Sequence, residues 1–159
     1  MELRTDKIRA CFDRKIGNFT ELWNLSTNTN YVRCAPRDPL IELYGLKNGE
    51  RVKLSGHISD VAEAADALIL SYDSFGEYDI SAKVTCRCEQ DRLVFSAEIC
   101  NHSTIDVTEI LMPHLGGIYL GNGQKDYLIY PHHAGDKTEY PVYNYAENRM
   151  TFWRGCSVP

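Results

Sequence analysis

The chain has 159 residues, of which 43% are hydrophobic and 25% are charged, and its formal net charge at pH 7 is -5. This length suits one domain with a substantial core, and the composition is ordinary for a globular protein. The acidic balance, without a cluster of Lys or Arg, argues against nucleic-acid binding. The longest apolar run, residues 67–70, is far shorter than the ~20 residues of a membrane-spanning helix.

Segments that alternate apolar and polar side chains, separated by turn residues, predict strands along most of the chain. In the first half these segments are residues 8–12, 19–24, 40–44, 52–58 and 67–72. Turns are predicted at 15–18 and 47–50, where Gly and Asn occur. Residues 67–72 are apolar at both alternating positions, which indicates a central strand covered on both faces.

Residues 60–67 fit two local structures. Asp60 followed by Glu63 matches a capping box, and residues 61–67 are rich in Ala. One or two helical turns are therefore an alternative to a strand in this segment. No other segment carries a sustained period near 3.6 residues.

Residues 83–101 predict a long antiparallel hairpin with its turn at Gln90-Asp91. The predicted cross-strand pairs are Glu89 with Arg92, Cys88 with Leu93, Cys86 with Phe95, Val84 with Ala97, and Lys83 with Glu98. In this register one face is dry and carries Val84, Cys86, Cys88, Leu93, Phe95, Ala97 and Ile99. Side chains alternate across a strand, so the hairpin is expected to pack on one side only.

Six cysteines occur in the chain. Cys86 and Cys88 resemble a pair of metal ligands, but on a strand both point to the same dry face, and Cys100 lies several residues further along the sheet. Thiolates placed in this way cannot converge on one ion, so no metal site is predicted. Reduced core cysteines are the favoured interpretation, and a disulfide framework is the alternative.

Beyond the hairpin, strands are predicted at residues 107–112, 117–120 and 127–130. Together the strands and turns predict an all-β fold, an antiparallel two-layer sandwich with little or no helix. Residues 1–159 are interpreted as a single β-sandwich domain. The N-terminal segment lacks the apolar core of a signal peptide, so a cytoplasmic location is expected, with a secreted parent protein left open.

The C-terminal third is rich in aromatic residues, with six of the ten tyrosines between positions 119 and 145. Its segment 126–135, DYLIYPHHAG, contains the candidate substrate-binding residues Asp126, Tyr130, His132 and His133. One histidine in a loop after a strand could donate to a sugar hydroxyl, because binding groups collect in such loops. The alternative is a pair of solvated loop histidines, and the same two interpretations apply to His114.

The sequence marks no catalytic residue. Glycoside hydrolysis needs two carboxylates ~5 to 9.5 Å apart across one cleft, and nothing among the 22 acidic residues identifies such a pair. A nucleophile elbow, a phosphate-binding loop and a zinc-protease motif are also missing from the sequence, and no cofactor is predicted.

Three segments carry a family resemblance: residues 8–32, IRACFDRKIGNFTELWNLSTNTNYV; residues 93–118, LVFSAEICNHSTIDVTEILMPHLGGI; and residues 126–135. In this order they resemble the N-terminal β-supersandwich, galactose-mutarotase-like, of bacterial glycoside hydrolases similar to endo-α-N-acetylgalactosaminidases. The resemblance implies a sandwich that packs on a catalytic barrel, which would carry the catalytic carboxylates. It also implies that residues 1–159 are the N-terminal part of a longer chain.

Three functional hypotheses follow. The first is a non-catalytic accessory domain of a carbohydrate-active enzyme, whose partners are a carbohydrate, a catalytic barrel domain or both. The second is a small sugar mutarotase or epimerase with a His-carboxylate pair around His132 or His133. The third is an interaction module or subunit without chemistry, which would form an oligomer or bind a larger chain.

Overall fold

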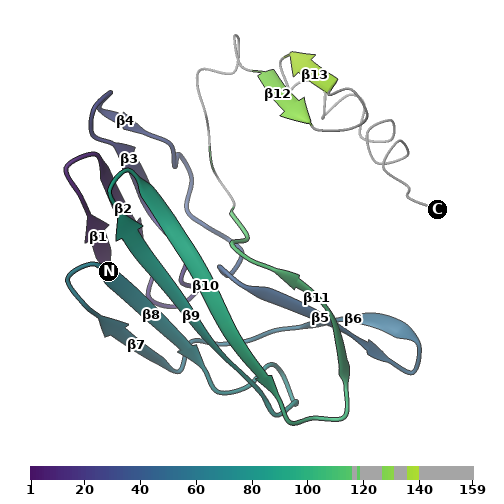
Figure 1. The fold of residues 1–159 in the computed structure, drawn as a ribbon. Coiled ribbons are helices and arrows are strands. Elements are labelled where there is room, and N and C mark those ends of the chain that lie inside the picture. Colours follow the sequence, from purple (N-terminus) through teal and green to yellow (C-terminus); the bar gives the residue numbers. More distant parts are fainter. Residues whose placement is uncertain (116–117, 119–126, 131–135, 140–159) are drawn as a thin grey trace. The chain divides into compact units, whose positions relative to one another are not determined.

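The computed structural model describes residues 1–115, 118, 127–130 and 136–139. The chain divides into two compact units, Met1–Ile118 and Tyr119–Pro159. All regular elements in the described residues are strands, and every strand pairing is antiparallel (Figure 1). The fold is therefore all-β, as the sequence predicted. No helix in this part of the chain is long and apolar enough to cross a membrane.

The first unit contains three sheets. The first sheet has the order β1-β2-β3-β4, formed by Glu2–Arg4, Ile8–Phe12, Phe19–Asn24 and Thr29–Asn30. The second has the order β10-β9-β8-β7, formed by Arg92–Asn101, Ile80–Glu89, Ala67–Tyr72 and Asp60–Glu63. The third has the order β11-β5-β6, formed by Asp106–Leu111, Glu42–Lys47 and Glu50–Leu54. In the second unit, β12 (Tyr127–Tyr130) pairs with β13 (Asp136–Glu139).

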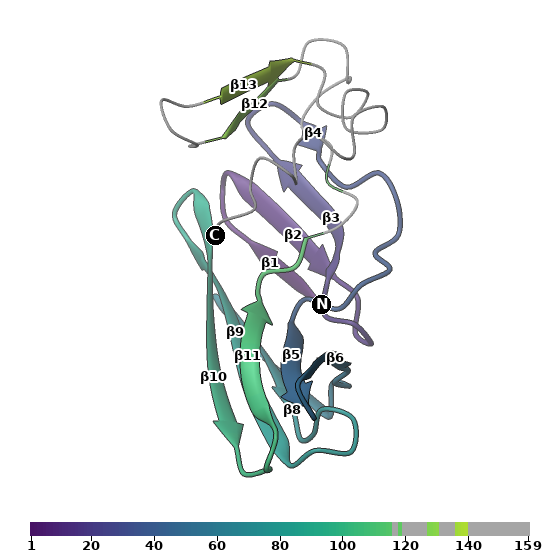
Figure 2. The ribbon, with the colours of Figure 1, turned by 90° about the vertical axis from the view of Figure 1, so that its right-hand side faces the viewer.

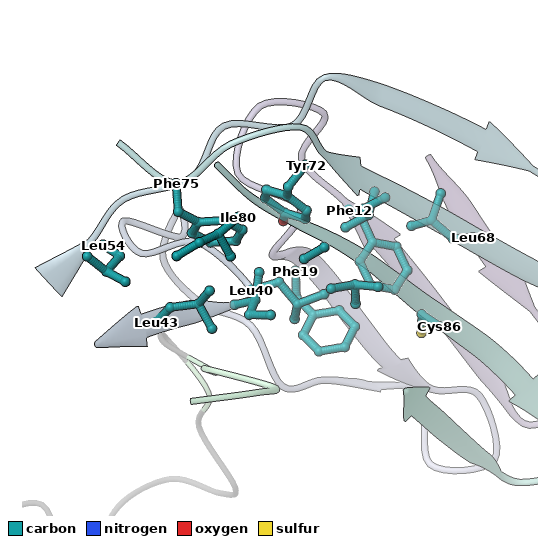
Figure 3. Close-up of a cluster of buried hydrophobic side chains, with 14 of the residues drawn as sticks. Phe12, Phe19, Leu40, Leu43, Leu54, Leu68, Tyr72, Phe75, Ile80 and Cys86 are labelled. Atoms are coloured by element: carbon teal, nitrogen blue, oxygen red, sulfur yellow. The ribbon is translucent and has the colours of Figure 1, made fainter. Parts of the chain in front are cut away.

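All three sheets of the first unit contribute to one hydrophobic core, which gives an open, sandwich-like arrangement (Figures 2 and 3). The β10-β9-β8-β7 sheet contributes alternate residues of β8 and β9, including Leu68, Tyr72 and Cys86. Phe12 and Phe19 enter the core from the first sheet, with ring centroids 4.8 Å apart. The packing on one side of β8 and β9 follows directly from the two-residue period of their apolar side chains.

The predicted hairpin is confirmed in every pair. Strands β9 and β10 are joined by Gln90 and Asp91, and their register matches the five predicted pairs, from Glu89↔Arg92 to Lys83↔Glu98. On the dry face, Val84 and Cys86 are buried and the remaining members are half-buried. Gln90 adopts a φ of 54°, which the tight two-residue connection requires.

Other predictions are corrected in detail. The helical alternative for residues 60–67 is wrong, because Asp60–Glu63 forms strand β7 and pairs with β8. Strand β8 is interior to its sheet, but Ile69 on its second face is only half-buried. Of predicted strand 117–120, Ile118 forms a single bridge with Val32, and the other three residues lie outside the described residues.

Candidate functional site

A cleft of about 550 Å³ in the first unit, here called the aromatic cleft, is the candidate ligand site. It lies between strands β2 and β3 and the turn end of the β9–β10 hairpin. Four aromatic residues line it: Phe19, Trp23, Tyr31 and Phe95. The aliphatic lining consists of Ile8, Leu22, Leu93 and Leu115, and the polar lining consists of Lys7, Asn24, Ser26, Asp91 and Arg92.

The hairpin end keeps the cleft open. Leu93 and Phe95 belong to the dry face of β10, yet both remain half-buried. Phe95 meets the edge of buried Phe19, with ring centroids 6.1 Å apart and planes at 84°. The wall of the cleft is thus continuous with the core, which holds these rings in place while leaving part of their surface accessible.

Trp23 is held by a chain of polar contacts across the first sheet. Its Nε1–H donates to Oε2 of Glu21 at 2.8 Å, and the same oxygen lies 3.1 Å from Nη2 of Arg9. Arg9 is the direct cross-strand neighbour of Trp23 and also donates through Nε to Glu2 at 3.1 Å. These contacts hold the indole ring on the face of the sheet that carries Arg9 and Glu21. Leu22 and Asn24, which line the cleft, belong to the opposite face.

Tyr31 is positioned by the short turn between β3 and β4. Its backbone N–H donates to the carbonyl of Leu22 at 2.8 Å. The side chain of Asn30 reinforces the turn, because its Oδ1 accepts from the backbone N–H of Leu22 and of Val32 at 3.1 and 3.0 Å. Both aromatic residues of this wall, Trp23 and Tyr31, are half-buried.

The polar side chains lie on both walls. Nζ of Lys7 approaches Oδ2 of Asp91 at 3.6 Å and so links the β1–β2 connection to the hairpin turn. Oδ1 of Asn24 accepts from the backbone N–H of Ser26 and Thr27 at 3.0 and 3.2 Å. The amide group of Asn24 is therefore directed by its own turn, and its Nδ2 has no hydrogen-bond partner within the described part of the chain.

This arrangement suits binding rather than hydrolysis. Aromatic faces pack against the apolar C–H face of a sugar ring, and the surrounding amide, hydroxyl and charged groups can bond its hydroxyls. Among the described lining residues, Asp91 is the single carboxylate. A pair of carboxylates, which glycoside hydrolysis uses, is thus not assembled by the described walls of this cleft.

A second polar group surrounds Glu42, a carboxylate in strand β5 whose exposed fraction is 3%. Oε1 of Glu42 is bonded by Nζ of Lys53 on β6, and Oε2 accepts from the hydroxyl of Tyr44 at 3.0 Å. Nδ1 of His114 lies 3.5 Å from Oε1, outside hydrogen-bond geometry. The structure therefore brings His114, one of the ambiguous histidines, to a buried carboxylate.

The electrostatics of this group are those of a stable ion pair. Burial acts to raise the pKa of Glu42, but hydrogen bonds from Lys53 and Tyr44 outweigh it and place the pKa below the ordinary 4.5. The bond to Glu42 raises the pKa of Lys53 above 10.5. A carboxylate held ionised in this way is a poor proton donor or acceptor near neutral pH, so we assign Glu42 a structural role.

A small cavity of about 180 Å³ adjoins Glu42 and Lys53. Tyr72 also lines it; its hydroxyl is buried without a hydrogen-bond partner in the described residues, and burial raises its pKa to about 12. Glu42 is the single carboxylate among the described lining residues of this cavity, and it is held in the ion pair with Lys53.

The candidate residues from the sequence are placed as follows. Asp126, His132 and His133 lie outside the described residues. Tyr130 is the last residue of β12, opposite Asp136 of β13, and the structure describes only its backbone. The substrate-binding role of these four residues stays a prediction.

Neither Trp23 nor Tyr31 was predicted from the sequence as a site residue. The pattern of β3 did mark Trp23, because this large aromatic residue occupies an alternating position that should face water, next to Asn24 and the polar turn after it. Glu42 also had a signal, because it interrupts the apolar run of Leu40, Ile41 and Leu43. Its partners could not be found in this way, since they come from other strands.

The five described cysteines, Cys11, Cys34, Cys86, Cys88 and Cys100, are free thiols. Burial raises the pKa of the Cys86 thiol to about 12, which keeps it protonated and unreactive near neutral pH. Within the described residues, no three metal-binding side chains come together.

Comparisons of the chain with protein-family models, with curated proteins and with solved structures found no match.

Proposed function

We propose that this chain is a non-catalytic β-sandwich module of a carbohydrate-active enzyme of the glycoside-hydrolase type, and that the aromatic cleft binds saccharide. The observation that supports this best is the combination of aromatic and polar lining residues in one open cleft. The position of Tyr31, fixed by the bond of its backbone N–H to the carbonyl of Leu22 at 2.8 Å, adds to it. Preorganised aromatic surfaces bind at low entropic cost because few rotamers are lost.

The catalytic barrel belongs to the same proposal. It rests on the resemblance of segments 8–32, 93–118 and 126–135 to the N-terminal sandwich of such enzymes. The single described carboxylate of the cleft is consistent with a module that holds substrate while another domain supplies the hydrolytic pair.

The test of saccharide binding uses Tyr31→Ala. The wild-type chain and the variant are compared by affinity electrophoresis against a panel of soluble polysaccharides, and hits are quantified by calorimetry. We expect the variant to lose at least tenfold in affinity, because a stacked ring surface contributes on the order of 1.4 kcal/mol or more.

Tyr78→Ala is the matched control, since Tyr78 is a half-buried aromatic residue that does not line the cleft. It should bind as the wild type does. Circular dichroism establishes that both variants fold. Absence of binding to every polysaccharide by the wild type, or unchanged affinity of a folded Tyr31→Ala variant, would overturn the proposal for this cleft.

A further inference from the structure

Among the described strands, β10 forms a long outer edge of its sheet. In the described part of the chain it pairs on one side only, with β9, over ten residues and without a register shift. It contains no proline, and its inward-facing residues Leu93, Phe95, Ala97 and Ile99 carry no charge. An edge of this kind presents a row of free backbone donors and acceptors to another strand.

The other edges of the first unit are protected by length or irregularity. Strands β1, β4, β7 and β6 have three, two, four and five residues. Strand β11 has six residues, and its register is interrupted between Val107 and Glu109. Short or bulged edges resist the addition of a strand, so β10 is distinguished from all of them.

The turn fixes which residues offer their backbone to a new strand. The pair that closes the two-residue connection, Glu89 and Arg92, is hydrogen-bonded, and bonded and non-bonded pairs alternate from there. Arg92, Val94, Ser96 and the later even-numbered residues thus bond to β9. The odd-numbered residues, such as Phe95, direct their N–H and C=O groups to the open edge.

We propose that two copies of this chain associate by antiparallel pairing of their β10 strands, about a two-fold axis at Phe95. Phe95 would then pair with Phe95 of the partner subunit, and Leu93 with Ala97 of the partner subunit. These are the hydrogen-bonded pairs of the seam. On the wet face Arg92 would lie opposite Glu98 of the partner subunit, at both ends of the seam. The Arg92 side chain is 71% exposed and contacts Glu89 of its own hairpin at 3.0 Å, and Glu98 is exposed. The guanidinium group has further donors, so it can contact Glu98 of the partner subunit as well.

Charge selects this register. Among registers that keep the same backbone bonding, a shift of the axis to Val94 places Arg92 opposite Ser96, and a shift to Ser96 places it opposite Cys100. Of these three axes, only the one at Phe95 places two pairs of opposite charges across the seam. Because the strand is complementary to itself in this way, a second copy fits the edge better than a partner of unrelated sequence.

Charge reversal tests the proposal in the full chain. Sedimentation equilibrium should show a dimer for the wild type, and Arg92→Glu or Glu98→Arg should each raise its dissociation constant at least tenfold. The combination of both changes should restore dimerisation, since the opposite charges are then only exchanged. Arg87→Glu is the control; it lies on the same face but on the interior strand β9 and should leave the dimer intact.

Disulfide trapping tests the register. Val94 of one subunit would lie opposite Ser96 of the partner subunit in a non-hydrogen-bonded pair. Their Cα atoms would be ~4.5 Å apart, which suits a disulfide. In a Cys34→Ser, Cys100→Ser background, Val94→Cys with Ser96→Cys should give a linked dimer in air. Val94→Cys alone should give no linked dimer, because two copies of residue 94 would face each other only if the two-fold axis lay at Val94.

Three results would overturn the proposal. A wild-type chain that is monomeric at all concentrations would show that the edge is covered by the rest of the chain or reserved for another protein. A dimer that the combined charge exchange does not restore would have another interface. Efficient linking of Val94→Cys alone would reject the register. None of these outcomes depends on saccharide binding.

Discussion

Glu42 shows how one charged side chain can be accommodated in a strand of a sandwich. Its exposed fraction is 3%, and an unpaired carboxylate in this position would be strongly destabilising. Lys53 and Tyr44 satisfy its two oxygens, while the Lys53 side chain keeps 42% of its surface in water. The pair thus avoids the full cost of burying two charges.

This geometry predicts a pH-dependent stability. The folded pKa of Glu42 lies below 4.5, so its contribution is complete above that pH and is lost as the pH falls through the folded value. At pH 7, Glu42→Gln should lower the free energy of unfolding by about 1 to 3 kcal/mol. Urea titrations at several pH values should show this difference shrinking below pH 4.5.

Glu109→Gln provides the comparison, because Glu109 forms an exposed ion pair with Arg51 at 2.8 Å. This substitution should lower the free energy of unfolding by less than about 1 kcal/mol at every pH. A Glu42→Gln variant whose deficit is the same at pH 3 and pH 7 would contradict the ion-pair account.

At the scale of elements, Asn18 joins three segments of the first unit. The residue is fully buried, and its Nδ2 donates to the carbonyls of Asp38 and His114 at 2.9 and 2.8 Å. Its Oδ1 accepts from the backbone N–H of Phe19 at 2.9 Å. The turn before β3 is thereby tied to the segment before β5 and to the segment after β11. The engaged, buried amide also makes Asn18 unsuitable for glycosylation in the folded protein, although its sequence matches a sequon.

Replacement of Asn18 should therefore be costly. Asn18→Ala would leave two carbonyls without their donor and should destabilise the protein by about 3 kcal/mol. Asn18→Asp should be worse at neutral pH, since it places a charge against the same two carbonyls. Urea denaturation measures both effects.

Asn101→Ala is the matched case, because Asn101 donates to the carbonyl of Ile105 at 2.8 Å but is exposed. We expect this variant to lower the free energy of unfolding by about 1 kcal/mol, since water can replace the lost bond. Equal effects of Asn18→Ala and Asn101→Ala would show that the buried bonds do not join the segments as described.

In strand β7, pairing with a neighbouring strand overrides a local sequence signal for a helix. Asp60 and Glu63 match a helix start, yet the segment pairs with residues 68–71 of β8. Four residues of helix would gain little on their own, because nucleation is unfavourable. The adjacent strand offers backbone bonds at once, and context then overrides the weak propensity.

At the scale of the whole molecule, several large apolar side chains of the first unit remain exposed. Leu46, Leu115 and Ile110 have exposed fractions of 42%, 42% and 51%. Such side chains are compatible with contacts to a further domain, as the proposed catalytic barrel would supply.

The proposal of a longer enzyme predicts the mass of the native polypeptide. An antibody raised against this chain should detect a product much larger than 18.1 kDa in source cells. Preincubation of the antibody with the purified chain should remove the signal, which establishes its specificity. A native product of 18.1 kDa would reject the multidomain architecture while leaving saccharide binding by the cleft to its own test.

The sequence by itself determined the all-β class, the boundaries of β2, β3 and β12, and the full register of the β9–β10 hairpin. These features depend on a two-residue period and on turns between neighbouring segments, so the information is local. The candidate residues Asp126, Tyr130, His132 and His133 came from the same local patterns and stay predictions.

Only the tertiary structure decided how distant segments meet. The aromatic cleft joins Trp23 and Tyr31 to the end of a hairpin at Leu93 and Phe95, and the ion pair of Glu42 joins strands β5 and β6. Such contacts depend on the order of strands within sheets and on the packing of one sheet against another. Side chains far apart in the chain share no periodic pattern that would mark them as neighbours, which is why folding had to bring them together before the site could be recognised.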